Sequence, residues 1–211
     1  MNKFDVIIIG AGPAGIFTAY ELTKKNNQLK VLLVDKGRDI YTRKCPILQK
    51  KLEKCPPPTK RKDYAGCLPA CSITNGFGGA GAYSDGKFNI TTEFGGWMTD
   101  YLSGQAVLDL ILYVDKINLQ HGATTNITDP LTPKVFEIER RAYGSGLKLL
   151  RSKVRHLGTE HNLEILKSIY EYLKDKVTML FSTEIEDILV ENKRVTGFKQ
   201  KKVRYFLPIM L

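Results

Sequence analysis

The sequence has 211 residues, of which 43% are hydrophobic, and a formal net charge of +10. This composition is ordinary for a globular protein and allows one large domain with a real core. No apolar stretch reaches the roughly 18 residues that a membrane span requires, and the first apolar run, 6–9, is too short for a signal peptide. We therefore expect a cytoplasmic protein without a membrane partner.

The basic residues are spread along the chain in short groups, at positions 50–51, 60–62, 140–141, 148–155 and 199–204. They coincide with no recognised nucleic-acid motif, and aromatic residues do not interleave with them. We interpret them as a solvated surface, part of which is available to an anionic cofactor or substrate, and expect no nucleic-acid partner.

A glycine-rich turn follows the first predicted strand. Residues 6–9 are all apolar and β-branched, which is typical of a strand buried on both faces of a parallel sheet. The spacing G-x-G-x-x-G follows at residues 10–15, where Pro13 suits the first turn of a helix that we expect to reach about Lys25. The N–H groups and the dipole at the start of such a helix favour an anion, so this unit predicts a pyrophosphate site.

A second apolar strand, 31–34, ends in Asp35, twenty residues after Gly15. A dinucleotide-binding βαβ unit has an acidic residue at this place, which accepts hydrogen bonds from ribose hydroxyls. The acid favours a free 2′-hydroxyl, so the sequence predicts FAD or NAD rather than a 2′-phosphorylated dinucleotide.

All four cysteines, Cys45, Cys55, Cys67 and Cys71, fall in one segment with the spacing C-x9-C-x11-C-x3-C. The spacing matches neither a zinc ribbon nor a standard ferredoxin, and a disulfide framework does not suit a reducing cytosol. Three interpretations stay open: metal or cluster ligation, a redox-active pair, and ordinary loop or core cysteines.

A second glycine-rich segment spans 76–86, with Ser84, Asp85 and Lys87 at its end. Glycine buries no side chain, so this density predicts a backbone that passes close to a ligand. The alternative is a flexible surface loop, although apolar residues such as Tyr83 make the segment less polar than a simple linker.

The rest of the chain alternates helical and strand-like patterns. We expect helices over 104–121, where Gly122 follows as a C-terminal cap, over 134–150 and over 161–176, with a short helical stretch at 47–54. We expect strands at 154–157, 177–182, 184–190 and 194–199, the last two joined by a tight turn at Asn192-Lys193, and an uncapped apolar stretch at 203–211.

These residues resemble a known family. Gly10 to Gly15 with Asp35, followed by a β-meander, is similar to the FAD-binding fold of the glutathione-reductase type. Within it, the run from Cys67 to Lys87, with Gly-Ala-Gly-Ala-Tyr-Ser-Asp-Gly-Lys, resembles the signature of the uncharacterised FAD-dependent, or NAD(FAD)-utilising, dehydrogenases, as does Arg-His-Leu-Gly-Thr-Glu at 155–160.

The resemblance implies an α/β, Rossmann-like FAD/NAD(P)-binding fold with a central parallel sheet, a β-meander and a partial inserted substrate domain. We expect the FAD-binding domain in 1–100 and, truncated, in 156–211, with the inserted domain at 101–155. Relatives continue past this length, with a second glycine-containing strand turn and a late Gly-Asp segment, so we expect an N-terminal portion of a longer enzyme.

The implied cofactor is FAD, with NADH or NADPH as electron donor. The glycine turn would hold the pyrophosphate, Asp35 and Lys36 the adenosine side, Ile185 the adenine through its backbone, and 78–84 the flavin end. The cofactor-binding residues so implied are Gly10, Gly12, Pro13, Ala14, Gly15, Asp35, Lys36, Gly78, Gly79, Gly81, Ala82, Ser84 and Ile185.

Two residues are candidates for chemistry. A cation such as Lys87 near the flavin would stabilise the reduced anionic form, and His156 is either a general acid or base or a structural hydrogen-bonding residue. No metal site is implied. We expect an FAD-dependent oxidoreductase of dehydrogenase type acting on a small molecule that the sequence does not identify. The alternatives are a non-catalytic dinucleotide-binding fragment and a flavoprotein that acts on RNA.

Overall fold

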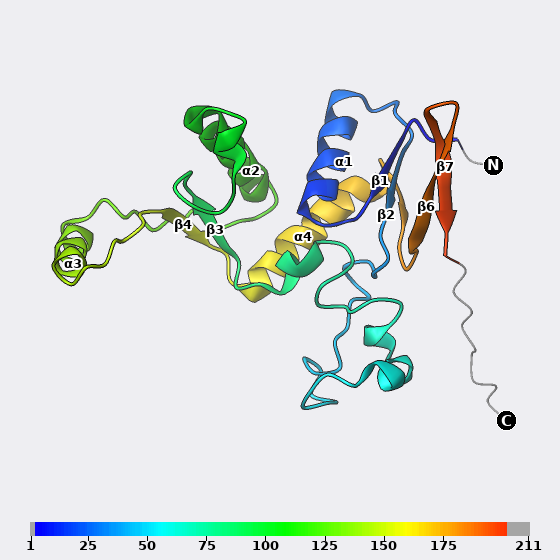
Figure 1. Ribbon diagram of the computed structural model, residues 1–211, viewed down its shortest axis with the longest axis horizontal. Helices are drawn as coiled ribbons and strands as arrows, with labels where there is room; N and C mark the ends of the chain where they lie inside the picture. The colour runs from blue at the N-terminus through cyan, green and yellow to red at the C-terminus, as the bar shows by residue number, and fades with distance from the viewer. Residues whose placement is uncertain (1–2, 202–211) are drawn as a thin grey trace. The chain divides into compact units, whose positions relative to one another are not determined.

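The computed structural model describes residues 3–201, and the apolar stretch at 203–211 lies outside them. The chain divides into two compact units, one made of residues 1–81 with 170–211 and the other of residues 82–169 (Figure 1). Each unit is described by itself below.

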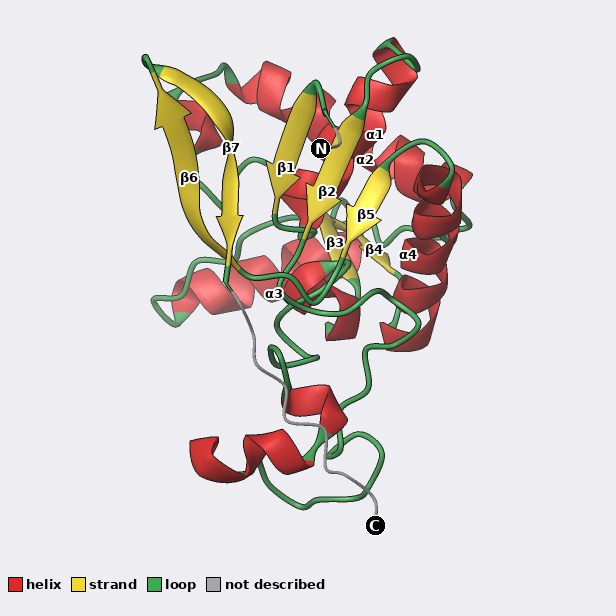
Figure 2. Cartoon of the chain, turned by 90° about the vertical axis from the view of Figure 1, so that its right-hand side faces the viewer, coloured by secondary structure: helices red, strands yellow, loops and turns green. Residues whose placement is uncertain are grey.

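The first unit is built on a parallel sheet of three strands. β1 (Val6–Ile9), β2 (Val31–Val34) and β5 (Thr178–Leu180) lie in the order β1-β2-β5 (Figure 2). The helix α1 (Pro13–Lys25) connects β1 to β2, with proline in its first turn and two lysines in its last turn, as the macrodipole favours. The predicted strand–glycine turn–helix–strand unit is therefore confirmed within these bounds.

The two first strands differ in burial. All four residues of β2 are buried, as expected of a central parallel strand, whereas the side chains of β1 are half-buried and Ile9 is 50% exposed. The expectation that β1 is buried on both faces is thus wrong in the described residues, because β1 has a neighbour on one side only. A doubly wound sheet places strands on both sides of its first strand.

The last two strands form a separate hairpin. β6 (Ile185–Glu191) and β7 (Arg194–Gln200) pair antiparallel through the predicted tight turn, where Asn192 and Lys193 have φ of 49° and 62°. Two successive residues with positive φ are typical of a type I′ turn. The expected β-meander would join β5 to this hairpin. Instead β5 pairs in parallel with β2, and the described part of the chain adds no third strand to the hairpin.

The second unit contains a two-stranded antiparallel sheet and helices. β3 (Lys87–Ile90) pairs with β4 (Lys153–His156), and the helices α2 (Gly104–Gln120) and α3 (Pro133–Gly144) lie between them in sequence. α4 (Thr159–Lys174) begins in the second unit and ends in the first. α2 ends as predicted, with Gly122 at a φ of +99° just after the cap. α3 stops at Gly144, six residues before the predicted end, and Gly146 follows it at a φ of +75°.

The segment between β2 and β3 contains only turns and short 3-10 helices, namely Pro58–Asp63, Ala65–Cys67 and Gly79–Tyr83. The short helix expected at 47–54 is absent; residues 46–50 form turns instead. Within residues 3–201, no helix is both long and apolar enough to span a bilayer.

Candidate functional site

The turn between β1 and α1 has the geometry of an anion cradle. Gly10 has a φ of +106°, and its N–H donates to the carbonyl of Val34 at 2.7 Å. A Cβ on Gly15 would lie 1.9 Å from the carbonyl oxygen of Gly10, so only glycine lets the helix pack this closely on the turn. A Cβ on Gly12 would meet nothing within 4 Å, which leaves open space in front of this residue.

The first turn of α1 contains no side chain that could neutralise the positive end of the helix dipole. Gly12 is the N-cap, no side chain caps the helix, and its first turn contains no acidic residue. The first N–H groups of a helix lack intrahelical partners, and together with the macrodipole they favour an anionic ligand. This open, uncapped turn fits the pyrophosphate of a dinucleotide.

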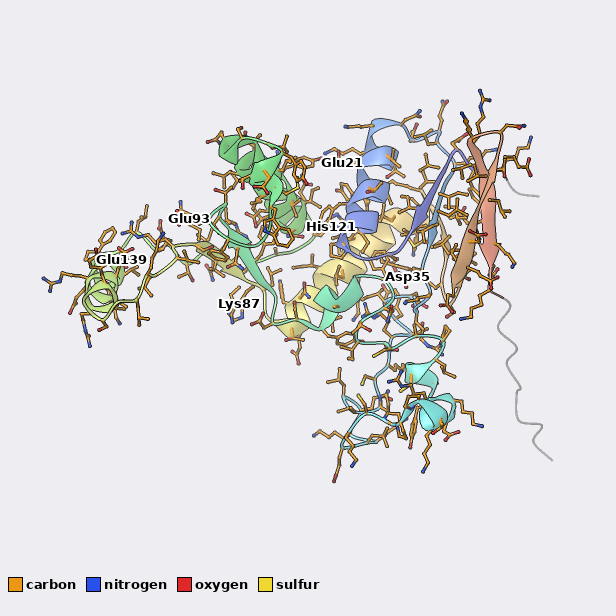
Figure 3. All side chains as sticks on the ribbon, viewed as in Figure 1. Glu21, Asp35, Lys87, Glu93, His121 and Glu139 are labelled. Atoms are coloured by element: carbon orange, nitrogen blue, oxygen red, sulfur yellow. The ribbon has the colours of Figure 1, made fainter. Side chains whose placement is uncertain are left out.

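Asp35 lies at the end of β2 (Figure 3) and is 9% exposed. Its Oδ2 accepts from the N–H of Ala11 at 2.7 Å, and its Oδ1 accepts from the N–H groups of Gly37 at 2.6 Å and Gly76 at 2.9 Å. An ionised carboxylate has about four acceptor positions, so one position is left for a ribose hydroxyl. The ribose contact stays a prediction. The structure adds a role that the sequence did not suggest: the carboxylate joins three loops.

The second glycine-rich segment begins directly against the first. Gly78 donates its N–H to the carbonyl of Ala11 at 2.8 Å, and a Cβ on Gly79 would lie 3.3 Å from the Cα of Gly12. Gly37 approaches Gly76 more closely still, since a Cβ on Gly37 would lie 2.3 Å from the Gly76 nitrogen. These contacts explain Gly37 and Gly79 by close backbone approach, and they place the start of the segment, 76–79, against the glycine turn at 10–15.

A buried arginine fixes this segment. Arg43 is 4% exposed, and its guanidinium donates to four backbone carbonyls, those of Ser72, Ile73, Phe77 and Gly79, at 2.6–2.9 Å. Phe77 is fully buried, and its ring meets Tyr170 edge-on with centroids 5.2 Å apart. Sequence reasoning missed Arg43 because it stands in a charged segment that resembles a solvated loop.

The other predicted cofactor-binding residues differ in exposure and in the unit to which they belong. Lys36 is exposed, and Ile185, half-buried, is the first residue of β6. Gly81 closes the first stretch of the first unit, whereas Ala82 and Ser84 belong to the second unit, where the Ser84 hydroxyl accepts from the N–H of Gly86 at 3.2 Å. Their contacts with a cofactor stay predictions.

The two residues predicted for chemistry are neighbours in the second unit. Lys87 opens β3 and His156 closes β4, and the register places them opposite each other (Lys87 is labelled in Figure 3). The ammonium of Lys87 lies 2.7 Å from Oδ2 of Asp85, and all three residues are exposed. The hydrogen bond from Lys87 lowers the pKa of the Asp85 carboxyl, helped by the positive charge of Lys87 and a smaller contribution from His156. The strand pairing thus gathers an acid, a cation and an imidazole.

A buried ion pair anchors the strand that carries His156. The guanidinium of Arg155 donates to both carboxylate oxygens of Asp115 on α2, at 2.6 and 2.7 Å, and to the carbonyl of Thr124 at 2.6 Å. Both side chains of the ion pair are 7% exposed. The hydrogen bonds that Arg155 donates to Asp115 raise the pKa of Arg155 above its ordinary value.

Residues 4–206 match the family described as pyridine nucleotide-disulphide oxidoreductase. The chain belongs to this family. Membership confirms the α/β, Rossmann-like fold, places the chain in a family of oxidoreductases, and supports FAD as the cofactor that suits the open turn at Gly12. The finer resemblance to one family of FAD-dependent dehydrogenases is not decided by this match.

Two solved structures are similar to the chain at low sequence identity. A 3-ketosteroid-Δ4-(5α)-dehydrogenase from Rhodococcus jostii RHA1, solved with 4-androstene-3,17-dione, matches 94% of the chain with a TM-score of 0.51 and 12% identity. An L-amino acid deaminase from Proteus vulgaris matches 95% with a TM-score of 0.49 and 12% identity. The chain spans 42% and 45% of these two proteins.

A short stretch of the chain has high sequence identity to another protein. Over 36 residues, or 17% of the chain, it is 56% identical to an uncharacterized protein of Methanosarcina barkeri (strain Fusaro / DSM 804), of which the match covers 9%. The similarity therefore identifies a related sequence without assigning a reaction.

Proposed function

We propose that this chain is the FAD-binding part of an FAD-dependent dehydrogenase that acts on a small molecule. The observation that carries the proposal is the turn at Gly12, which is open, uncapped and without an acidic residue in the first turn of α1. The family match over residues 4–206 supports the same cofactor.

In the proposed binding mode, each part of FAD contacts a different segment of the chain. The N–H groups at the start of α1 bind the pyrophosphate, and the remaining acceptor position of Asp35 takes a ribose hydroxyl. The exposed Lys36 lies on the adenosine side, and the backbone of Ile185 contacts the adenine. The segment that starts at Gly78 leads toward the flavin end of the cofactor.

When bound, FAD supplies the hydride and electron transfer. The chain's own residues then have three tasks: to hold the cofactor, to orient it, and to place charge where it is needed. Lys87 offers an ammonium group and His156 an imidazole, and the β3–β4 register places the two residues opposite each other. We propose that they act as an electrostatic partner and a proton carrier.

The test is binding followed by reduction. The purified chain is mixed with FAD or, in parallel, with NAD⁺, and binding is measured by the change in flavin absorbance and fluorescence and by the shift in melting temperature. The proposal expects saturable binding of FAD, little of NAD⁺, and bleaching of the bound flavin by NADH or NADPH without oxygen.

The outcomes separate the proposal from its rival. FAD binding without bleaching by NADH or NADPH would support the rival hypothesis, a non-catalytic dinucleotide-binding fragment, and would contradict the enzymatic part of the proposal. Absence of FAD binding by a folded chain would contradict the proposal as a whole.

A further inference from the structure

The helix α3 carries large apolar side chains that face solvent. No residue of α3 is buried in the described structure, and α3 stands apart from α2 within the second unit (Figure 1). Tyr143 is 82% exposed, and Leu147, just after the helix, is 62% exposed. Large apolar side chains that gather on a surface indicate a binding site, whereas single exposed apolar residues are common.

A glycine turn after α3 folds the chain back along the helix. Leu147 donates its N–H to the carbonyl of Ala142 at 2.9 Å, and Gly146 donates its N–H to the carbonyl of Tyr143 at 3.0 Å. Together with the φ of +75° at Gly146, these two bonds form a Schellman motif, which is a common way for a helix to end. The motif places residues 147–149 beside the end of α3, where they border the same cavity as the helix.

A groove lies between one face of α3 and the returning segment 147–149. Phe136, residues 139–140 and Tyr143 follow the spacing i, i+3, i+4, i+7, so they share one face of the helix. With residues 147–149 they line a cavity of about 490 Å³. Cavities of roughly 300–1,000 Å³ typically hold small organic ligands.

Arg151 stabilises one wall of the groove. Its guanidinium donates to both carboxylate oxygens of Glu139, from Nε at 3.1 Å, and lies 4.7 Å from the centroid of the Phe136 ring (Glu139 is labelled in Figure 3). The hydrogen bond from Arg151 lowers the pKa of the Glu139 carboxyl, helped by the positive charge of Arg151. Because the negative charge of Glu139 is matched by Arg151, it does little to oppose an anionic ligand.

Two further cations border the groove. Arg140 and Lys148 are exposed and line the cavity. Neither forms an ion pair within residues 3–201. Their positive charge is local, because residues 82–169 contain ten Lys or Arg and ten Asp or Glu residues and are neutral as a whole. The groove thus combines apolar side chains with two cations that lack an acidic partner.

We propose that this groove binds a free carboxylic acid with an apolar body, such as a fatty acid. The apolar body lies on Tyr143, Leu147 and Leu149, and the carboxylate lies between Arg140 and Lys148. A guanidinium donates to both oxygens of a carboxylate, and an ammonium adds a second positive charge. All of these residues belong to the second unit, so the inference does not depend on FAD binding.

The charge and the size of the groove favour a free acid over an anionic membrane surface. Recognition of anionic lipid surfaces typically uses clusters of about 4–8 basic residues. Here two unpaired cations border a cavity of about 490 Å³ in a unit without net charge. The ligand therefore needs both an apolar body, which fills the cavity, and a negative charge, which pairs with the two cations.

The experiment uses the full chain and decanoate as the probe, with 1-decanol, decyltrimethylammonium and inorganic phosphate in parallel calorimetric titrations. We expect saturable binding of decanoate, weaker binding of decanol, and none of the other two. Removing both cations in Arg140→Gln with Lys148→Gln should weaken decanoate binding about five- to tenfold and leave decanol binding unchanged. Lys134→Gln with Arg141→Gln is the matched control, because both residues are exposed on α3 and lie outside the groove.

A second variant, Leu147→Asn, tests the apolar part of the groove. Because Leu147 is exposed, the variant should keep its melting temperature while it binds both decanoate and decanol more weakly. Equal affinity for decanoate and decanol, tight binding of phosphate alone, or an equal loss in the matched control would each overturn the proposal. So would the absence of saturable decanoate binding, or binding that appears only with phosphatidylserine vesicles.

Discussion

Asp35 accepts a hydrogen bond on Oδ1 from the N–H of Gly76, forty-one residues later in the chain, at 2.9 Å. Through this contact the acid at the end of β2 touches the second glycine-rich segment while its other oxygen holds Ala11 of the first. One carboxylate therefore connects the two backbone segments that we assign to FAD. The connection makes the shape of the proposed cofactor site depend on the hydrogen bonds of a single side chain.

The first prediction concerns this carboxylate. Asp35→Asn replaces one acceptor oxygen by an NH₂ group that faces backbone N–H donors, so at least one buried N–H loses its partner. We expect a loss of about 1–3 kcal/mol in the free energy of unfolding together with weaker FAD binding, measured by urea denaturation with and without FAD. Asp5→Asn is the matched control, because Asp5 accepts from the N–H of Lys30 at an exposed site. An equal loss in the two variants would contradict the role of Asp35.

The second prediction concerns Arg43. Arg43→Lys keeps the charge, but an ammonium has three donors and lacks the planar fork that reaches four carbonyls. Leaving buried carbonyls without partners should reduce the free energy of unfolding by about 1–3 kcal/mol and weaken FAD binding. Ser72→Ala is a local control: its hydroxyl has no hydrogen-bond partner in the described structure, and the backbone carbonyl that Arg43 binds is retained. A lysine variant as stable as Ser72→Ala would argue against the assigned role.

The third prediction concerns the buried ion pair of the second unit. Asp115→Asn leaves the guanidinium of Arg155 buried without its counter-charge, and we expect a loss of about 3–5 kcal/mol in the free energy of unfolding. Glu186→Gln breaks the exposed pair with Lys199, and because solvent screens this pair the loss should be much smaller. Chemical denaturation of both variants compares the two costs directly. Similar costs would mean that the Arg155–Asp115 pair is not buried as described.

The fourth prediction concerns the cluster of Asp85, Lys87 and His156. Because the pKa of Asp85 is lowered in the folded chain from its ordinary value of 3.8, the group stabilises the fold above that pH. This stabilisation is lost as the pH falls through the lower folded value. Lys87→Gln should raise the pKa of Asp85 back toward 3.8, whereas His156→Gln should change it less, as NMR titration of the carboxyl would show. A larger effect of the histidine variant would reverse the assigned order of causes.

Local patterns in the sequence predicted much of the fold. The strand–turn–helix–strand unit over 6–34, the cap at Gly122 and the turn at Asn192-Lys193 depend on neighbouring residues, and all three are confirmed. Pairing between distant segments was not predictable in this way. β3 was missed because 87–90 is a run of only four residues, half of them polar. No local pattern indicates that β5 pairs with β2 rather than with β6.

In the candidate site too, local features were predictable from the sequence and contacts between distant residues were not. The glycine spacing pointed to the anion cradle, because glycine is required wherever backbones approach closely. The contacts of Asp35 with Gly76 and of Arg43 with four carbonyls join residues far apart in sequence and depend on the folded loop. A buried arginine in a charged segment has no local pattern to distinguish it from a solvated one.

The most direct test of the central claim is the binding of FAD by Gly12→Ala. Because the added Cβ meets no protein atom within 4 Å, the variant should fold with the stability of the unmodified chain while its methyl group occupies the place of the pyrophosphate. Gly104→Ala, at another open glycine, is the matched control and should bind FAD normally. Our account predicts loss of FAD binding by a folded Gly12→Ala; a variant that retains its flavin with unchanged affinity would contradict it.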